Sequence, residues 1–563
     1  MTIRPAARPP LSAATVAAGT VPHEVLDADV LVAGGGPAGT WAAIAAARAG
    51  ARVVLVDKGR CGTSGATAAA GTGVWYVEPD PDARQAAMAS REAHGGYLSD
   101  RGWMARVLDE TYARIAELDE VPRYPFPIGP DGRQLRTSLQ GPDYMLRQRI
   151  RVDRLGVQVM DHSPLLELLV DGDGAVAGGR GVHRRTGAGY EIRAGAVVLA
   201  TGGCAFASKT LGCDVDTGDG ALLAVEVGAR LSGMEFSNAY AIAPAFTSVT
   251  KTAYYSFATF YRPDGTVLEG AGSERGRSVI ARALLEGPVL ARLDHADEAA
   301  QRAIRIDQPN FLLPFDRLGI DPFTDLFPVT LVLEGTVRGT GGVRVDAADC
   351  SAGVPGLYVA GDTATRELIC GGFTGGGSHN AAWAVSSGSW AGRGAARHAL
   401  STLPPSGRRG GPRPGGRPAG RAGLRPAATG TPGRVDVREV LGAVQAEVMP
   451  YEKNYLRDGA RLAPALAALD AIWADVRDHL QATGTDRLRA REVTAMTAHA
   501  RWMYTAALAR TESRGMHRRA DQPGPDPAQH HRLVVSGLDR PRVRPEAVTA
   551  AATGRRSLPA VTS

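Results

Sequence analysis

Short apolar runs bounded by glycine or acidic residues alternate with segments of helical periodicity along most of the chain, the pattern of an α/β protein. The clearest case spans residues 29–59, where an apolar run at 30–33 is followed by a glycine turn and an Ala-rich segment. A second apolar run at 53–56 ends in Asp57. Because such short runs are typical of buried parallel strands, we predict a strand–turn–helix–strand unit here.

The glycine turn of this unit has the spacing of a dinucleotide site. Gly34 permits the tight turn, Gly36 lets the backbone approach a diphosphate, and Gly39 lets the helix pack against the strand. The helix start supplies N–H donors, and Asp57 would accept hydrogen bonds from a ribose hydroxyl. GxGxxG alone is a weak signal among 70 glycines, but the complete order of elements predicts a dinucleotide site, for NAD or FAD equally.

The same periodicities predict further elements beyond this unit. They are helices at 82–93, 100–118, 278–285, 381–398 and 490–511, a helix opened by Asp219, a helical stripe at 462–480, and strands at 156–161, 165–171, 181–184, 194–203 and 357–362. Residues 237–334 break the pattern. Because a second glycine loop at 370–380 can meet the first only if the intervening part forms a separate lobe, we predict an inserted domain there.

Composition and charge narrow the class of protein. The 563 residues are 44% apolar and 22% charged, which is typical of a soluble globular protein. The first 28 residues lack a continuous apolar segment, so we expect no signal peptide and a cytoplasmic location without a membrane span. Five cysteines without a CxxC pair argue against a metal site or an iron–sulfur cluster in this chain. The net charge of +6 includes seven Arg within 401–434, so the remainder is near −1 and predicts no nucleic-acid surface.

A resemblance to a known family rests on several motifs in a fixed order. They are GGGPAGTWAAIAAARAGARVVLVDK, SGATAAAG, ATGG, TGDGALLAVEVGARLSGMEF, GRSVIARAL, GLYVAGD, GGGSHNAAWAVSSGSWAG and ARTESRGMHRRADQPGPD. With these motifs the chain resembles the flavoprotein of the fumarate reductase and succinate dehydrogenase superfamily, which includes aspartate oxidase and adenylylsulfate reductase alpha chains. A different flavoenzyme with two dinucleotide motifs is the alternative.

The resemblance implies FAD as the cofactor and an α/β fold: a Rossmann-like FAD-binding domain, an inserted α+β capping domain and a C-terminal helical domain. Members with covalent FAD use a His where this chain has Gly65, so we predict non-covalent FAD. The predicted domains are a disordered lead-in (1–27), the FAD-binding domain (28–236 and 335–400), the capping domain (237–334), a disordered linker (401–434), the helical domain (435–527) and a tail (528–563). The predicted FAD-binding residues are Gly34, Gly36, Pro37, Ala38, Gly39, Asp57, Lys58, Ser64, Thr67, Ala70, Gly71, Ala200, Thr201, Gly202, Asp219, Gly361, Asp362 and Ser378.

The resemblance also names catalytic candidates. The motif RSVIARA matches the family's segment with the catalytic Arg and makes Arg277 the candidate, whereas a solvated Arg or an ion pair to Glu274 is the structural alternative. The guanidinium pKa exceeds about 12, so stabilising developing negative charge is a less demanding role for Arg277 than moving a proton. Tyr240 and His379 are further catalytic candidates, each with a structural alternative as a packed Tyr or a helix cap. The arginines of ESRGMHRRAD are expected to be structural.

Three departures from the family concern the substrate. Tyr240 and Val337 replace two histidines that bind substrate, and Phe373 replaces an Arg that clamps a carboxylate. Because two buried negative charges need paired donors, we predict an FAD-dependent dehydrogenase or reductase that acts on a non-dicarboxylate in a less cationic, more aromatic pocket. A small ferredoxin-like iron–sulfur subunit is a predicted partner, as in adenylylsulfate reductases. The alternatives are an oxygen-using oxidase and a non-catalytic electron-relay flavoprotein.

Overall fold

An eight-stranded sheet forms the centre of the protein in a computed structural model that describes residues 24–129, 132–274, 276–373, 376–402, 414–425 and 435–548. Its strand order is β16-β6-β7-β8-β1-β2-β5, with β15 beside β8. The strands are β1 (Glu24–Ala33), β2 (Val53–Val56), β5 (Gln158–Met160), β6 (Leu165–Val170), β7 (Val176–Val182), β8 (Gly189–Leu199), β15 (Leu357–Val359) and β16 (Arg417–Pro418). The pairs among β1, β2, β5, β8 and β15 are parallel, so these strands end at one edge of the sheet.

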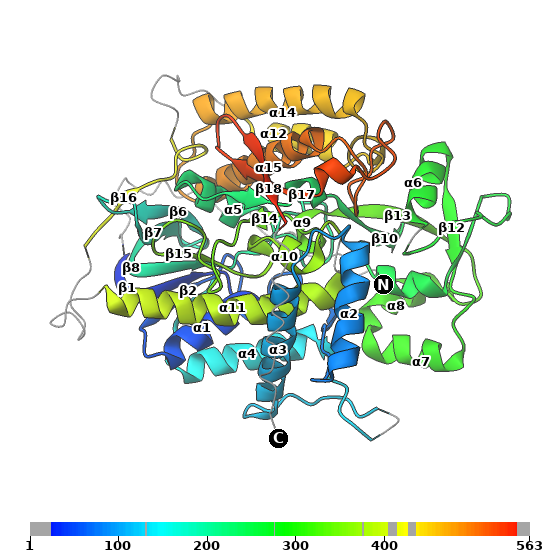
Figure 1. Cartoon of the computed structure of the whole chain (residues 1–563), viewed down its shortest axis with the longest axis horizontal. Helices are drawn as coiled ribbons and strands as arrows, with labels where there is room; N and C mark the ends of the chain where they lie inside the picture. Colours follow the sequence, from blue (N-terminus) through cyan, green and yellow to red (C-terminus); the bar gives the residue numbers. More distant parts are fainter. Residues whose placement is uncertain are drawn as a thin grey trace, which may run out of the picture.

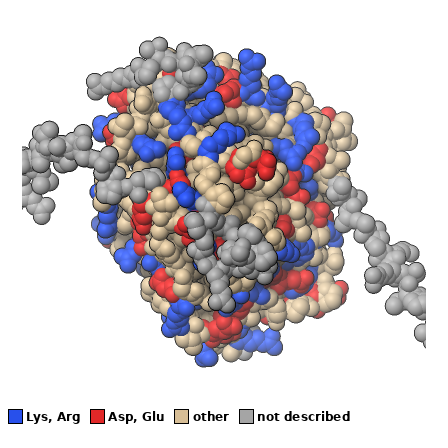
Figure 2. Space-filling model, turned by 90° about the vertical axis from the view of Figure 1, so that its left-hand side faces the viewer, with Lys and Arg blue, Asp and Glu red and all other residues tan. Residues whose placement is uncertain are grey.

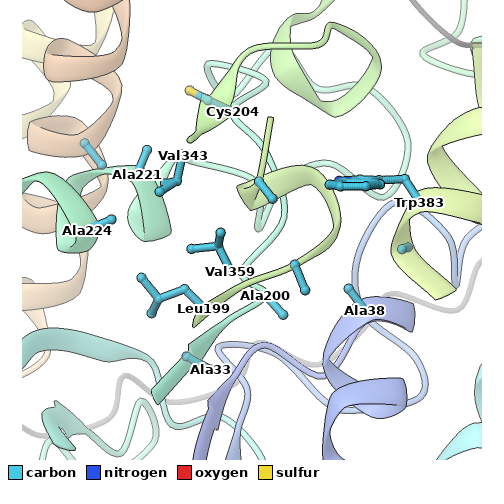
Figure 3. Packing of buried hydrophobic residues seen from close by; sticks show 14 of the residues in the cluster. Ala33, Ala38, Leu199, Ala200, Cys204, Ala221, Ala224, Val343, Val359 and Trp383 are labelled. Carbon is cyan, nitrogen blue, oxygen red and sulfur yellow. The ribbon is translucent and has the colours of Figure 1, made fainter. Parts of the chain in front are cut away.

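Two helices, α1 (Pro37–Arg48) and α11 (Gly376–Ser401), pack against each other beside this sheet (Figure 1). They approach closely because α11 carries glycine at the contact. A Cβ at Gly388 would lie 2.3 Å from the Ala38 carbonyl oxygen, and one at Gly392 would lie 2.2 Å from that of Ala42. Figure 3 shows small side chains where the strands end, among them Ala33 of β1 and Ala200 after β8. The helix predicted at 381–398 is confirmed with an earlier start.

The segment predicted as an inserted domain has an antiparallel sheet of its own, at the right in Figure 1. Its order is β10 (Ala239–Pro244), β13 (Phe327–Glu334), β12 (Val289–Arg292) and β11 (Thr259–Tyr261), with helices α6 (Arg277–Glu286), α7 (Glu298–Asp307) and α8 (Pro309–Leu318). Three of its side chains hold the backbone of residues 69–71: Lys251 donates to Gly71 O (3.2 Å), Gln308 accepts from Gly71 N (3.2 Å) and Asn310 donates to Ala69 O (3.0 Å). These contacts join the inserted lobe to the sheet domain.

The C-terminal part contains helices α12 (Val437–Val448), α13 (Tyr451–Asn454), α14 (Gly459–His479) and α15 (Asp486–Ala509) at the top of Figure 1. The remaining elements are α2 (Pro81–His94), α3 (Arg101–Ala116), α4 (Gly141–Arg154), α5 (Asp219–Glu226), α9 (Gly335–Arg338), α10 (Glu367–Cys370), β3 (Gly71–Gly73), β4 (Ser138–Gln140), β9 (Leu231–Ser232), β14 (Gly342–Val343), β17 (His531–Ser536) and β18 (Arg542–Ala547). The helices predicted near 82–93, 100–118 and 490–511 are confirmed.

Four predictions from the sequence were wrong in part. Residues 531–547 are not a tail, because β17 and β18 form a hairpin that joins β9, and the apolar side chains of residues 533–535 are buried. Residues 414–425 are not a disordered linker: β16 pairs with β6, and Leu424 is buried. The strand predicted at 181–184 is β7, which begins earlier, at Val176. Its glycines obscured the apolar pattern of a strand. Gly181 is needed for packing, because a Cβ there would lie 2.2 Å from the Pro164 carbonyl oxygen. The predicted lead-in ends at residue 23 instead of 27, because residues 24–27 belong to β1 and pair with β8. The predicted disorder of residues 1–23, 403–413 and 426–434 lies outside the described residues.

No helix among the described residues is both long enough and apolar enough to cross a membrane. On the face shown in Figure 2, positive and negative side chains are interspersed. All five cysteines are free and buried, and the described residues contain no group of three His, Cys, Asp or Glu side chains placed to hold a metal ion.

Candidate functional site

A large cavity opens at the edge of the sheet where the parallel strands end. It encloses about 1210 Å³, counting the part open to solvent. This is the edge at which open parallel sheets bind ligands. Its lining includes Gly34 to Ala38, Asp57, Lys58, Ser64 to Thr67, Ala70 to Thr72, Ala200 to Gly202, Asp216, Asp219, Val337, Arg338, Gly361, Asp362, Asn380, Ala381 and Ala384. Of the predicted FAD-binding residues, Gly39 and Ser378 alone are not part of this lining.

The glycine turn has the geometry that a diphosphate requires. Gly34 has φ +108°, and a Cβ there would lie 2.2 Å from Ala200 O. Gly36 is the N-cap of α1, its added Cβ would meet nothing within 4 Å, and no side chain caps the helix. The first N–H groups of α1 are therefore available to an anion. Gly39 lies beneath the turn, where a Cβ would be 1.7 Å from Gly34 O, so its role is close packing of helix and strand.

Asp57 organises the wall next to this turn. Its Oδ2 accepts from the Gly35 N–H (2.6 Å), and its Oδ1 accepts from the Gly59 N–H (2.7 Å) and the Ser64 hydroxyl (3.1 Å). The carboxylate lines the cavity, so it is placed to meet a ribose hydroxyl while it holds the loop. Ser64 lines the cavity as predicted, and its hydroxyl also donates to Arg60 O (2.7 Å).

Lys58 carries the neighbouring positive charge. Its ammonium lies 2.7 Å from Asp219 and 3.1 Å from Glu492 of α15. Burial disfavours the charged form, but the two carboxylates more than offset it, so the pKa of Lys58 is raised above its ordinary value. Lys58 therefore joins the sheet domain to the C-terminal helices at the cavity wall.

Several residues at the cavity were not among the predicted FAD-binding residues. Asp216, Arg338 and Asn380 line the cavity. Lys251 donates a hydrogen bond to the carbonyl oxygen of Gly71, which also lines the cavity. Burial and the nearby Arg338 lower the pKa of Lys251 to about 8, against an opposing effect of Glu334. The sequence could have indicated Asp216 by its position directly before the TGDG motif. No motif indicated Lys251, because it comes from the inserted lobe.

A second, smaller cavity contains the catalytic candidate Arg277. It encloses about 400 Å³ including solvent-open space and is lined by Tyr240, Glu274, Arg277, Phe373, Tyr455, Gly515, Met516 and Arg518. An outer cavity shares Glu274, Phe373, Gly515 and Arg518 with it, so the two are parts of one cleft, which we call the Arg277 cleft. The structure thus brings together Arg277, Tyr240 and Phe373, which are far apart in the sequence.

The Arg277 cleft and the large cavity border the same elements without sharing a lining residue. Tyr240 lies on β10, and Val337 and Arg338 lie on α9, which is bridged to β10 through Ala239 and Gly335. The paired segments β10 and α9 thus contribute to the linings of the two spaces, and we call this boundary the seam.

Two catalytic candidates have structural contacts. Tyr240 is 1% exposed, and its hydroxyl lies 2.9 Å from the carbonyl oxygens of both Val448 and Met449. His379 is buried, packs on the Trp75 ring at 4.6 Å and has its Nδ1 3.2 Å from the Ser378 hydroxyl. These contacts match the structural alternatives, a packed Tyr and a helix-start His, so neither side chain contributes to our proposed chemistry.

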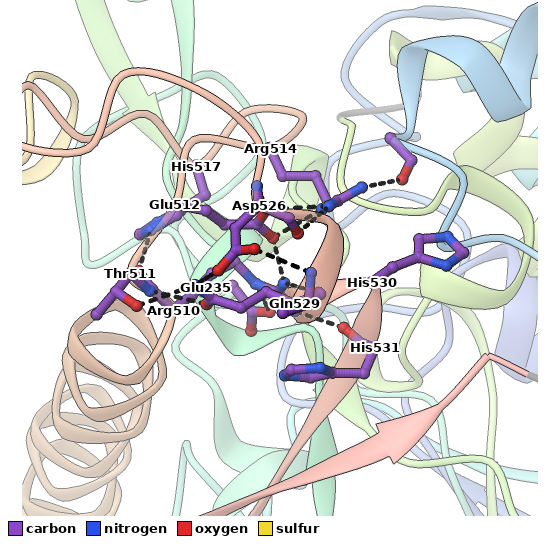
Figure 4. Close-up of polar contacts among 12 residues, drawn as sticks. Glu235, Arg510, Thr511, Glu512, Arg514, His517, Asp526, Gln529, His530 and His531 are labelled. Atoms are coloured by element: carbon purple, nitrogen blue, oxygen red, sulfur yellow. Dashed lines mark hydrogen bonds and ion pairs between the residues drawn. The ribbon is translucent and has the colours of Figure 1, made fainter.

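A network of buried ions supports one wall of the Arg277 cleft (Figure 4). Arg510 lies 2.8 Å from Glu235 and 2.7 Å from Glu512, which also accepts from Arg514 (2.7 Å). Arg514 reaches on to Gly96 O (2.8 Å), the carbonyl of a residue of the outer cavity. As expected, Arg514 and Arg519 form ion pairs, whereas Arg518 lines the cleft and forms no ion pair with a described residue.

The large cavity fits FAD by its own geometry. It offers an uncapped helix start, a glycine turn whose middle residue faces open space, an acid at a strand end and a far end walled by Ala70, Gly71 and Ala381. Fold and cavity thus define a protein that binds an extended dinucleotide across the ends of a parallel sheet.

Comparison with known proteins specifies this class. Residues 29–245 match the family "FAD binding domain", and residues 445–556 match "Fumarate reductase flavoprotein C-term". The chain belongs to the fumarate reductase and succinate dehydrogenase flavoprotein superfamily and is an FAD-dependent oxidoreductase.

Similar proteins cover nearly the whole chain. An L-aspartate oxidase of Streptomyces coelicolor is 27% identical over 92% of this chain and 93% of its own length. A fumarate reductase flavoprotein subunit of Mycobacterium tuberculosis is 27% identical, covering 88% and 92%. Among solved structures, an E. coli quinol fumarate reductase aligns with a TM-score of 0.75 at 20% identity over 94% and 98% of the two chains. Adenylylsulfate reductase of Archaeoglobus fulgidus aligns at 0.74 and 18% identity over 94% and 96%, so both structures support the fold.

Proposed function

We propose that this oxidoreductase acts on a small molecule other than a dicarboxylate, bound in the Arg277 cleft. The observation that carries the proposal is the meeting of Arg277, Phe373 and Arg518 around one cleft beside the FAD cavity. FAD, when bound, supplies hydride transfer to or from an activated carbon. The chain supplies the positive charge, the shape of the cleft and the exclusion of water.

Arg277 is the residue placed to act on charge in this cleft. Arg277 is the first residue of α6 and is partly buried. One of its five N–H groups donates a hydrogen bond to Tyr240 O (2.9 Å). This bond fixes the guanidinium to β10 at the seam with the FAD cavity. A guanidinium held in this way stabilises negative charge that develops on a carbonyl or enolate oxygen of the substrate, without having to give up its proton.

The charges of the cleft favour a substrate with one negative charge. Arg277 and Arg518 line it together with Glu274, which leaves a net charge of about +1 among the lining side chains. A dicarboxylate brings two negative charges, and the second would face Glu274 or the aromatic walls without a paired donor. Arg518 makes the cleft more cationic than the sequence alone predicts, but the balance still disfavours a dianion.

The aromatic wall favours a flat apolar part in the substrate. Phe373 is held between the Arg91 guanidinium, 5.8 Å from its ring centre, and the His94 ring at 5.4 Å. Tyr455 also lines the cleft, and its ring packs on that of Tyr240 at 5.5 Å. We therefore expect a monoanion with a planar or aromatic body, with its carboxylate toward the arginines and its ring against Phe373.

The test uses matched ligands and variants of the FAD-loaded enzyme. An arylated monocarboxylate, its amide and an aliphatic dicarboxylate are added in turn, and binding is followed by the change in flavin absorbance. We expect the monocarboxylate to bind at least about tenfold more tightly than the others, because it alone matches both charge and shape. Phe373→Arg should shift this preference toward the dicarboxylate. Tighter dicarboxylate binding by the unmodified enzyme would overturn the substrate class.

Arg277 is tested separately from the substrate class. Arg277→Ala should lower turnover of any substrate found by about 10²–10³-fold, as expected for loss of one group that stabilises developing charge. Arg518→Ala should weaken binding with a smaller effect on turnover, because Arg518 lines the outer cavity as well as the inner one, whereas Arg277 lines the inner one alone. Full turnover by the Arg277→Ala enzyme would remove Arg277 from the mechanism.

The route of the electrons is part of the same proposal. All five cysteines are buried and free, so a cluster-bearing electron partner would have to supply its own ligands. We propose such an iron–sulfur partner, whereas an oxidase would use oxygen directly. Stoichiometric peroxide from substrate in air would favour the oxidase. A flavin that is reduced by substrate but reoxidised slowly in air would favour the partner.

A further inference from the structure

The FAD cavity contains a buried carboxyl group that lacks a cation. Asp216 lines this cavity and is 4% exposed. Its backbone is fixed, because its N–H donates to Cys213 O (3.0 Å) and its carbonyl accepts from the Ala205 N–H (2.8 Å). Among the described residues, its Oδ2 has no hydrogen-bond partner. Such a group is costly to bury unless a ligand completes its bonding.

The backbone next to Asp216 leaves room for its carboxyl group. Gly202, which also lines the cavity, has φ +82°, and a Cβ there would lie 2.1 Å from Asp216 Oδ1. The carboxyl group is therefore held at the surface of the cavity by a backbone that has no room for another side chain. Its position is set by the fold, and the residue lines the cavity that fits FAD.

Charged neighbours face Asp216, but the cations among them are already paired. The nearby charged groups are Asp362, Lys58 and Asp219, and the Cys213 thiol is also in contact. Lys58 is committed to Asp219 (2.7 Å) and Glu492 (3.1 Å). Asp362 is ion-paired with the fully buried Arg366. Asp216 is thus left with two carboxylates and no cation of its own.

Two neighbouring carboxyl groups, of which one alone is paired with a cation, hold their protons unequally. Burial raises the pKa of Asp362, but Arg366 and Arg338 oppose this effect. Burial and the nearby Asp362 raise the pKa of Asp216 well above its ordinary value, against a smaller opposing effect of Lys58. The favoured state of the pair is therefore an ionised Asp362 and a protonated Asp216. A protonated carboxyl group is a hydrogen-bond donor, and its neutral state avoids placing a second negative charge beside that of Asp362.

We propose that Asp216 takes part in FAD binding as a neutral acid, donating its O–H to an acceptor atom of the bound cofactor. FAD binding is then linked to one proton on this side chain. Because the contribution needs the protonated form, it is present at low and neutral pH and is lost as the pH rises and the carboxyl group ionises. The inference concerns the cofactor alone and does not depend on the substrate or on Arg277.

The experiment measures FAD release from the holoenzyme. The enzyme is diluted at several values between about pH 6 and about pH 9, and free FAD is measured by its fluorescence after ultrafiltration. We expect release from the wild type to increase about tenfold across this range, as for loss of one buried hydrogen bond. Asp216→Asn keeps a donor that cannot ionise, so its release should change little with pH. Asp214→Asn, an exposed acid two residues away, should behave as the wild type.

Two results would overturn the proposal. One is FAD release from the wild type that does not increase with pH. The other is an Asp216→Asn enzyme whose release increases with pH as steeply as that of the wild type. Infrared spectroscopy of the holoenzyme adds a direct readout, since the proposal requires a protonated-carboxyl band near neutral pH that Asp216→Asn removes. If the Asn variant fails to retain FAD, the wild-type pH dependence still decides.

Discussion

Replacing Glu512 by Gln should loosen the wall of the Arg277 cleft without removing the FAD site. Glu512 is 1% exposed and accepts from Arg510 (2.7 Å), Arg514 (2.7 and 2.9 Å) and the Asp526 N–H (2.7 Å). A Gln has one acceptor oxygen for these donors, and its NH₂ group would face at least one of them. Arg514 would lose its only ion pair among the described residues, while Arg510 would keep Glu235 at 2.8 Å.

The magnitude follows from the burial of the network. Breaking a buried pair by removing one partner costs about 3–5 kcal/mol, because the remaining charge is left uncompensated. Since Arg510 keeps one partner, we take the lower value, about 3 kcal/mol, which corresponds to roughly a 100-fold change in a local opening equilibrium. Burial raises the pKa of Glu512, but Arg514, the Asp526 N–H and Arg510 together bring it below its ordinary value. The stabilisation is therefore present at neutral pH and lost as the pH falls, where variant and wild type should converge.

The assay is amide hydrogen exchange of the FAD-loaded protein. We expect amides of residues 512–531 to exchange roughly 100-fold faster in Glu512→Gln, with FAD content unchanged. The control is Asp521→Asn, which breaks the pair of Arg519 with a carboxylate that is 38% exposed and should cost less than about 1 kcal/mol. Equal protection of residues 512–531 in Glu512→Gln and wild type, or an equal effect of Asp521→Asn, would refute the reasoning.

Two further predictions concern the cofactor. Asp57→Ala removes the acceptor for the Gly35 and Gly59 N–H groups and should weaken FAD binding at least about tenfold, measured by flavin fluorescence titration. Ser64→Ala should have a smaller effect, because Asp57 keeps both of its hydrogen bonds to the backbone. Non-covalent FAD is expected because Gly65 has no side chain to form a bond, so acid precipitation should release all of the flavin, and a yellow pellet would contradict this.

Local sequence was sufficient for the parts of the site made by contiguous residues. The turn at Gly34–Gly39, Asp57 at the end of β2, and Asp219 at the start of α5 could be predicted because each depends on one strand–turn–helix transition. The tail prediction failed because β17 is defined by its pairing with β9, some 300 residues earlier, which local polarity does not reveal.

The sequence by itself determined the cofactor class and the order of the elements, since backbone conformation and short-range hydrogen bonds are encoded by neighbouring residues. Only the tertiary structure decided which charges share a space. It placed Arg518 of the C-terminal part beside Arg277 of the inserted lobe, and it left Asp216 facing Asp362 without a cation. Such arrangements depend on which donors other segments have already used, because a buried charge is stabilised or destabilised by groups that are close in space and distant in sequence.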